Sequence, residues 1–315
     1  MQRAWARNRL PGRFLALGLL VVVCPALAAT KQTAKPRPTP VPRQIILPAK
    51  VVAGAQATLA VIDSMGRLLP DIAVELPGGQ KVTTDITGRA IFKAGDTPGT
   101  LLAKISGHAV TATTDVLAAD APGVRSAPGE APGGVSVASY PHVLAIHDRF
   151  ALEGSGFRGA ADSNQVSLNG DPCLVLASSP VSLVVLPGLR APVGDTTLHV
   201  AVAGTDAGQF LVSAVLLEFS GPAEAVNAGA TGQLTLHAHG TTQPLLVEVR
   251  NGSPGVIQLS KGNVQRLKTS GGEQNSAAID VKFVTGGNYS ITARLLPSED
   301  SQADLRAVGA TSRLR

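Results

Sequence analysis

Cysteine and aromatic residues are scarce in this sequence. Its 315 residues include two Cys, one Trp, two Tyr and seven Phe. The two Cys are Cys24 and Cys173, and Cys24 lies in an N-terminal segment that is expected to be removed, so the mature chain has no pair for an internal disulfide. The mature chain must be held together by hydrophobic cores, for which a hydrophobic content of 44% is ample.

The shortage of aromatic residues also limits how the chain could bind carbohydrate. Phe150, Phe210, Phe283 and Tyr289 fall at positions that alternation predicts to point inward. Few or none then remain for an exposed platform on which sugar rings could stack. Polar binding through loops stays open.

Acidic residues are missing from the N-terminal part of the chain. No Asp or Glu precedes Asp63, whereas the first 43 residues contain eight Lys and Arg, so the net charge of +5 leaves −3 for the remainder. A slightly acidic body lacks the electrostatic footprint of a nucleic-acid-binding protein, and no nucleic-acid partner is expected. The run of Lys261, Arg266 and Lys268 is interpreted as a solvated strand face.

Residues 1–28 have the pattern of a secretory signal peptide. Four Arg precede an uncharged apolar run from Phe14 to Val23, and Ala26-Leu27-Ala28 supplies small residues for a signal peptidase. The run is shorter than the roughly 20 residues that cross a bilayer, which disfavours an uncleaved anchor. Val residues before Cys24 disfavour lipidation. We expect export to the periplasm or cell surface, with membrane contact only through this segment before cleavage.

Residues 29–44 form a Pro-rich basic linker. Residues 30–43 contain four cations and four Pro, which favour an extended polyproline II conformation. A stiff spacer is the favoured interpretation, and electrostatic contact with an anionic envelope polymer is the alternative.

From residue 45 onward, short alternating runs predict antiparallel strands. Leu101, Ala103 and Ile105 are one example, and no segment sustains a 3.6-residue period. The 34 Gly and 22 Pro suit many tight turns. We predict an all-β fold of tandem immunoglobulin-like β-sandwiches. Three domains are expected at 45–118, 135–218 and 219–297, with a linker at 119–134 and a flexible tail at 298–315.

Two segments resemble known families of immunoglobulin-like domains. Thr84-Asp85 with Gly88-Arg89-Ala90 is similar to bacterial Ig-like and carboxypeptidase-regulatory-like modules, and Asp85 is expected to cap that turn. The segments Tyr140-Pro141, Phe150 to Phe157 and Val166 to Gly170 resemble the IPT/TIG family. The resemblance implies that Gly154 and Gly156 shape a Gly-x-Gly-Phe turn and that Phe157 plugs the sandwich. The family has no shared active site, so function stays open.

Residues 154–159 also match Gly-x-Gly-x-x-Gly, the pattern of a dinucleotide site. That site requires a helix directly after the glycines, whereas this segment leads into a hairpin. Asn169-Gly170 is a strong type I′ turn signal, because both residue types tolerate positive φ. A structural turn is the favoured interpretation of the glycines.

Residues that could carry chemistry do not cluster in the sequence. No Gly-x-Ser-x-Gly elbow occurs, and Cys173 has no basic neighbour to lower its pKa. His237 and His239 share a strand face and are the remaining, weak metal candidates. We therefore predict no catalytic residues and no cofactor or metal.

These observations favour an exported, non-catalytic protein of the cell envelope or surface. It would act as a binding or adhesion scaffold for a protein or an envelope polymer. The alternative is a passive spacer or an accessory subunit of an envelope assembly, and an enzyme is disfavoured.

The mature protein is expected to begin at Ala29 or Thr30, because cleavage should follow the Ala26-Leu27-Ala28 site. N-terminal sequencing of the exported form checks this. Recovery of a chain that retains Arg3 to Arg13 would show that the segment is an anchor.

Overall fold

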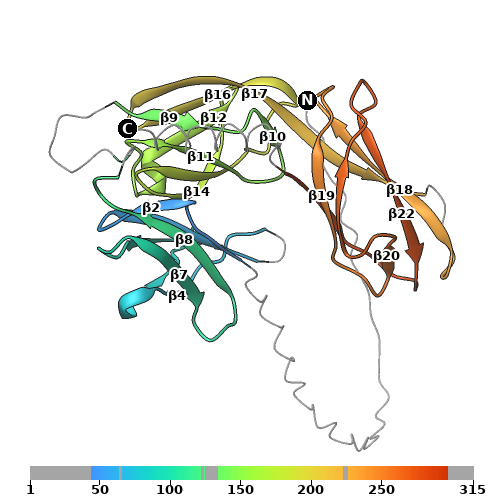
Figure 1. The fold of residues 1–315 in the computed structure, drawn as a ribbon, viewed down its shortest axis with the longest axis horizontal. Helices are drawn as coiled ribbons and strands as arrows, with labels where there is room; N and C mark the ends of the chain where they lie inside the picture. The colour runs from blue at the N-terminus through green and yellow to red at the C-terminus, as the bar shows by residue number, and fades with distance from the viewer. Residues whose placement is uncertain (1–43, 64–65, 122–123, 125–133, 223–225, 297–315) are drawn as a thin grey trace, which may run out of the picture. The chain divides into compact units, whose positions relative to one another are not determined.

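The computed structural model is built of β-strands, as the sequence predicts (Figure 1). It describes residues 44–63, 66–121, 124, 134–222 and 226–296, and these contain two short 3₁₀ turns and no α-helix. Within the same ranges, no helix is long and apolar enough to cross a membrane. The predicted signal peptide, nearly all of the basic linker, most of the 119–134 linker and the 298–315 tail lie outside the described residues.

Sandwich one comprises the strands from residue 44 to residue 117. One sheet has the order β2-β8-β7-β4-β5, and β3 pairs with both β1 and β6 in the other. Leu59, Phe92 and Ile105 are among the buried side chains between them. The elements are β1 (Gln44–Ile46), β2 (Lys50–Val52), β3 (Gln56–Ile62), β4 (Ala73–Glu75), η1 (Pro77–Gly79), β5 (Lys81–Thr83), β6 (Arg89–Lys93), β7 (Gly99–Ile105) and β8 (Thr111–Leu117).

Asp85 caps the turn before β6, as predicted. Its Oδ1 accepts hydrogen bonds from the backbone N–H of Thr87 at 2.8 Å and of Arg89 at 3.2 Å, and from the Thr87 hydroxyl at 2.6 Å. These bonds lower the pKa of Asp85, with the Thr87 hydroxyl as the main cause.

Sandwich two lies between residues 136 and 215. One sheet contains β14-β15-β11-β9 and the other contains β13-β12-β16-β17, with β10 running parallel to β17. The elements are β9 (Ser136–Ser139), β10 (Val143–Ala145), β11 (Phe150–Ser155), η2 (Ala161–Ser163), β12 (Asn164–Leu168), β13 (Asp171–Pro172), β14 (Leu174–Ser178), β15 (Ser182–Leu186), β16 (Gly194–Val202) and β17 (Thr205–Ser220).

The glycine segment 154–159 is needed for packing. A Cβ at Gly154 would overlap the carbonyl oxygen of Ser136, and Gly156 has a φ of +79°, a conformation that L side chains rarely adopt. A Cβ at Gly159 would overlap the carbonyl oxygen of Gln56 in sandwich one. Phe157 lies in the core of sandwich two with 3% of its surface exposed.

Asn169 and Gly170 connect β12 to β13 with φ values of +48° and +84°. Both values are positive, as a type I′ turn requires. Ala203 and Gly204 connect β16 to β17 in the same way, with φ values of +50° and +83°. Alanine is not a usual residue at the first of these positions, so residue types alone do not predict the second turn.

Sandwiches one and two share a sheet and a hydrophobic cluster. Thr58 of β3 pairs with Ser178 of β14, which joins the two sheets. A cluster with side chains from both sandwiches surrounds this junction; its buried members are Ile46, Ala60, Leu176, Ala177 and Val184. Strands β3 and β14 are consequently buried on both faces, whereas alternation predicts one solvated face for β3.

Polar contacts complete the junction between sandwiches one and two. The buried guanidinium of Arg89 donates to the carbonyl of Val175 at 3.2 Å and pairs with Asp162 at 2.8 Å. The Ser179 hydroxyl donates to the carbonyl of Lys50 at 2.6 Å, and the Lys50 ammonium pairs with Glu153 at 2.8 Å. These contacts supply partners for a buried guanidinium, which would be costly to leave unpaired.

Strand β17 passes from sandwich two into sandwich three. Its residues 205–214 pair with β16, and its residues 216–220 pair with β18 (Thr231–His239). The expected boundary at residue 218 therefore lies inside a single strand. Strand β10 reinforces the junction, because Leu144 packs in the second core and Ala145 in the third.

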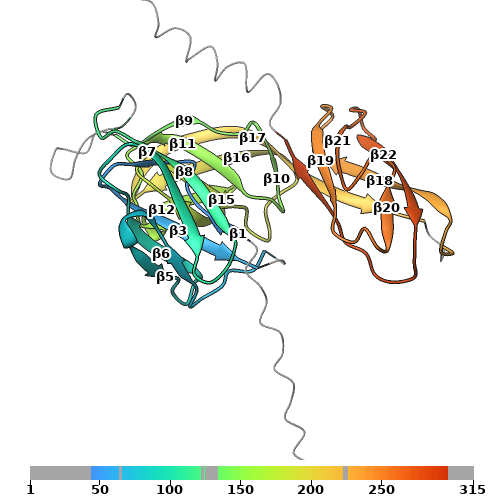
Figure 2. The same ribbon diagram turned by 60° about the horizontal axis from the view of Figure 1, so that its bottom comes forward.

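Sandwich three packs the end of β17 with β18, β22 and β20 against the sheet β21-β19-β23 (Figure 2). Its elements are β18 (Thr231–His239), β19 (Leu246–Asn251), β20 (Ile257–Leu259), β21 (Val264–Lys268), β22 (Ser276–Phe283) and β23 (Ile291–Leu295). Phe283 is buried as predicted, whereas Tyr289 precedes β23 and is 42% exposed. The inward position predicted for Tyr289 is wrong, because the strand begins two residues later.

Gly159→Ala should destabilise the junction between sandwiches one and two by about 1–3 kcal/mol, the usual effect of overpacking. The added methyl group would strike the backbone of Gln56, which cannot yield as a flexible side chain would. Gly95→Ala is the matched control, because a Cβ there meets open space. Denaturant titration of both variants checks this, and equal midpoints would contradict the contact.

Candidate binding surface on the third sandwich

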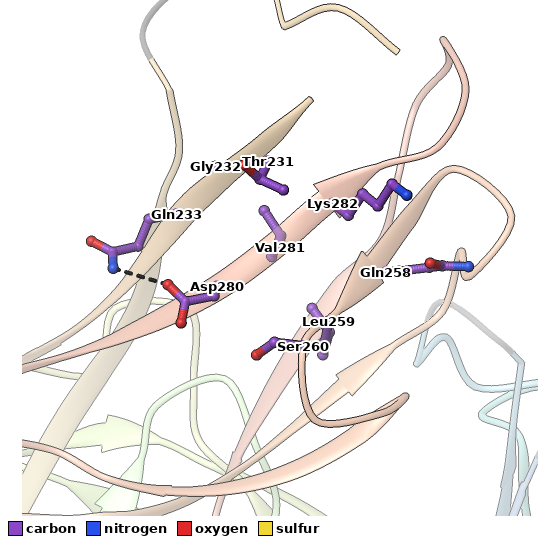
Figure 3. A pocket seen from close by; sticks show the side chains of 9 residues that line it. All are labelled: Thr231, Gly232, Gln233, Gln258, Leu259, Ser260, Asp280, Val281 and Lys282. Atoms are coloured by element: carbon purple, nitrogen blue, oxygen red, sulfur yellow. Dashed lines mark hydrogen bonds between the residues drawn. The ribbon is translucent and has the colours of Figure 1, made fainter. Parts of the chain in front are cut away.

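An open groove of about 710 Å³ lies on the outer face of β18, β22 and β20 (Figure 3). Strand register builds it from two rows of exposed side chains that cross the three strands. Thr231, Lys282 and Gln258 form the first row, since Lys282 is the Cα partner of both neighbours. Gln233, Asp280 and Ser260 form the second row, in which the N–H of Ser260 donates to the carbonyl of Asp280.

The groove residues alternate with side chains that form the core. Val281 and Leu259 are buried between the sheets, so the residues on either side of them must point outward. The same period-two pattern that builds the core therefore builds the polar rows. The sequence shows the alternation, but it does not show that three segments about 20 to 50 residues apart in the chain meet.

Most polar groups of the groove are available to a ligand. The Gln233 amide donates to the Asp280 carboxylate at 3.3 Å (Figure 3). Within the described part of the chain, the side chains of Gln258, Ser260 and Lys282 make no hydrogen bond or ion pair. They offer amide, hydroxyl and ammonium groups in an open recess. This arrangement suits hydrogen bonding to an extended polar molecule, and it places no nucleophile beside a base.

His237 and His239 lie together on one face of β18, as the sequence predicts. Their rings stack with centroids 6.1 Å apart, and an acidic neighbour, Glu218, comes from β17. His239 Nε2 lies 3.6 Å from Glu218, and His237 Nε2 lies 2.9 Å from the Ser220 hydroxyl. Glu218 is the cross-strand partner of His237. The sequence does not indicate this neighbour, because it lies on another strand, far from the two histidines in the chain. Among the described residues, however, no three such side chains converge as metal ligands.

Cys173 is partly buried and directly precedes β14. Burial raises the pKa of its thiol, which disfavours the reactive thiolate at neutral pH. The nearby Asp171 has one buried carboxylate oxygen without a hydrogen bond. This pair lacks the base that a cysteine nucleophile needs.

The chain has distant likenesses among solved structures. No protein-family model matches the chain, and no curated protein matches it. Domains 1–6 of the surface layer protein SbsC are 14% identical with a TM-score of 0.20, and the match covers 82% of this chain and 39% of that one. The chain thus spans about two fifths of the length of that six-domain structure.

Two further likenesses are to SGBP-B proteins. The one from a Bacteroides ovatus mixed-linkage glucan utilization locus is 9% identical, with a TM-score of 0.26 over 85% of this chain and 71% of that one. The one from a Bacteroides uniformis xyloglucan utilization locus is 11% identical, with a TM-score of 0.27 over 82% and 98%. Likenesses at this level assign neither a family nor a function to the chain.

The chain purified without chelator is expected to contain no stoichiometric metal, because His237, His239 and Glu218 do not converge on one point. Elemental analysis and thermal unfolding with and without EDTA check this. Stoichiometric zinc or calcium, or a melting midpoint that EDTA lowers, would make the two histidines functional.

Proposed function

We propose that the chain is an exported, non-catalytic binding scaffold of the cell envelope or surface. The observation that carries this proposal is the polar groove of sandwich three. Its side chains face solvent with unused donors and acceptors, whereas the interiors of the three sandwiches are filled by apolar side chains. Binding through an outer surface requires no cofactor and no convergent titratable groups.

The partner would be an extended polymer or a protein segment rich in hydroxyl or amide groups. The groove presents two rows of polar side chains two residues apart along each strand, roughly 6.8 Å, and neighbouring side chains within a row are one strand spacing apart, roughly 4.8 Å. Repeating polar groups along a chain could meet successive rows. The exposed Tyr289 makes a T-shaped ring contact with the core residue Phe283. Binding of a partner would therefore rest on polar contacts rather than on ring stacking.

The first two sandwiches would serve as the support for this surface. We infer that sandwich two is an IPT/TIG-type domain, which the buried Phe157 and the packed glycines Gly154 and Gly156 support. The shared sheet with sandwich one and the shared strand with sandwich three would give the binding surface a continuous support. A passive spacer would have the same supports without a partner at the groove.

Binding to insoluble cell-wall material from the producing cells tests the proposal. The mature chain should sediment with it, and the triple variant Gln233→Ala, Gln258→Ala, Ser260→Ala should bind at least about tenfold more weakly, as the loss of several hydrogen bonds predicts. The matched control is Thr100→Ala, Thr111→Ala, Thr113→Ala, which changes three exposed polar residues of a sheet in sandwich one.

Thermal unfolding of both triple variants shows that each is folded. If the wild type neither sediments with the wall material nor binds a soluble envelope protein, the proposal is wrong and the passive-spacer function is favoured. Equal weakening of both variants would show that the groove is not the contact.

A further inference from the structure

The sheet opposite the groove carries a concentration of positive charge. Four cations project from its outer face, and they are Arg250 of β19, Arg266 and Lys268 of β21, and Arg294 of β23. The core-facing residues between them, such as Val247 and Val249, show that this face points away from the core. Strand pairing brings these cations together from positions 250 to 294.

One acidic side chain lies at the centre of this cationic face. Glu248 is the cross-strand partner of both Arg266 and Arg294. Its carboxylate accepts a hydrogen bond from Arg250 Nε at 2.7 Å, and Arg266 Nε lies 3.9 Å away. Arg294 Nε pairs instead with Asp148 of sandwich two at 3.3 Å.

The exposed groups on the face are the cations and not the acid. The side chains of Arg250, Arg266 and Arg294 are 58–71% exposed, whereas that of Glu248 is 11% exposed. The hydrogen bond from Arg250 and the nearby arginines lower the pKa of Glu248, so it stays ionised and holds the guanidinium groups in place. Glu248 and the Asp148 carboxylate beside Arg294 offset two of the four cations, which leaves two positive charges in excess toward solvent.

Sandwich three is also more positively charged than sandwich two. Residues 219–297 contain six cations and four acids, whereas residues 135–218 contain three cations and seven acids. Like charges brought onto one face repel each other and are not needed for folding. An anionic partner would relieve that repulsion.

We propose that this cationic face binds an acidic polysaccharide through its carboxylate groups. Arginine forks recognise carboxylates in bidentate geometry, and Arg266 and Arg294 stand two strand spacings apart, about 10 Å, which lets a repeating polyanion reach both. A nucleic acid is disfavoured because the face has no aromatic residue on which bases could stack. The proposal rests on export toward envelope glycans and is independent of the groove.

Polygalacturonate, a carboxylated polysaccharide, is the probe for binding to the whole mature chain. Calorimetry should show binding at low ionic strength that weakens as salt is added. Arg266→Gln with Lys268→Gln should weaken it at least about tenfold, since charge-assisted bonds are lost. The control, Lys104→Gln with Lys261→Gln, removes the same charge at exposed positions outside this face and should change binding by less than about twofold.

Neutral dextran, single-stranded DNA and polyglutamate complete the experiment. Tighter binding of DNA or polyglutamate than of polygalacturonate would overturn the proposal, and so would equal binding of dextran. Equal weakening in the two double variants would show a general charge effect and also overturn it. If the first double variant does not fold, Arg266→Gln alone replaces it. The groove triple variant should bind polygalacturonate like the wild type, so the two proposals can fail separately.

Discussion

The burial of β3 and β14 between sandwiches one and two is the contact on which the architecture depends. Each strand has a second apolar face that would be exposed if its sandwich stood alone, and β3 and β14 would each leave backbone groups open to pairing. The Thr58–Ser178 pairing, the shared cluster and Arg89 cover these groups together. Each of the two sandwiches thus buries an apolar strand face and backbone groups that the other would leave exposed.

Continuity of β17 sets the place of the candidate surfaces. Because one strand belongs to both the second and the third sandwich, sandwich three is joined through paired backbone and through β10. Its two outer sheet faces then differ in chemistry: one presents neutral amide and hydroxyl groups with one ion of each sign, and the other presents arginines around Glu248. A single sandwich could therefore hold two chemically different partners.

Much of the local structure could be predicted from the sequence, whereas the candidate site could not. The inward positions of Phe150 and Phe283, the cap at Asp85 and the turn at Asn169-Gly170 follow from alternation and turn chemistry, which act between near neighbours. Arg266 and Lys268 looked like an ordinary solvated face, because Arg250 and Arg294 are distant in the chain. The same distance separated Glu218 from the two histidines.

The sequence by itself determined the all-β character, the turn positions and which side chains of most strands face a core. Only the tertiary structure decided which sheets join, which outer faces are covered and which polar side chains form rows. The physical reason is that alternation with period two specifies the two faces of a strand but not its neighbours. Strand pairing and cross-sandwich contacts select those neighbours over separations of tens to more than a hundred residues, as between Thr58 and Ser178.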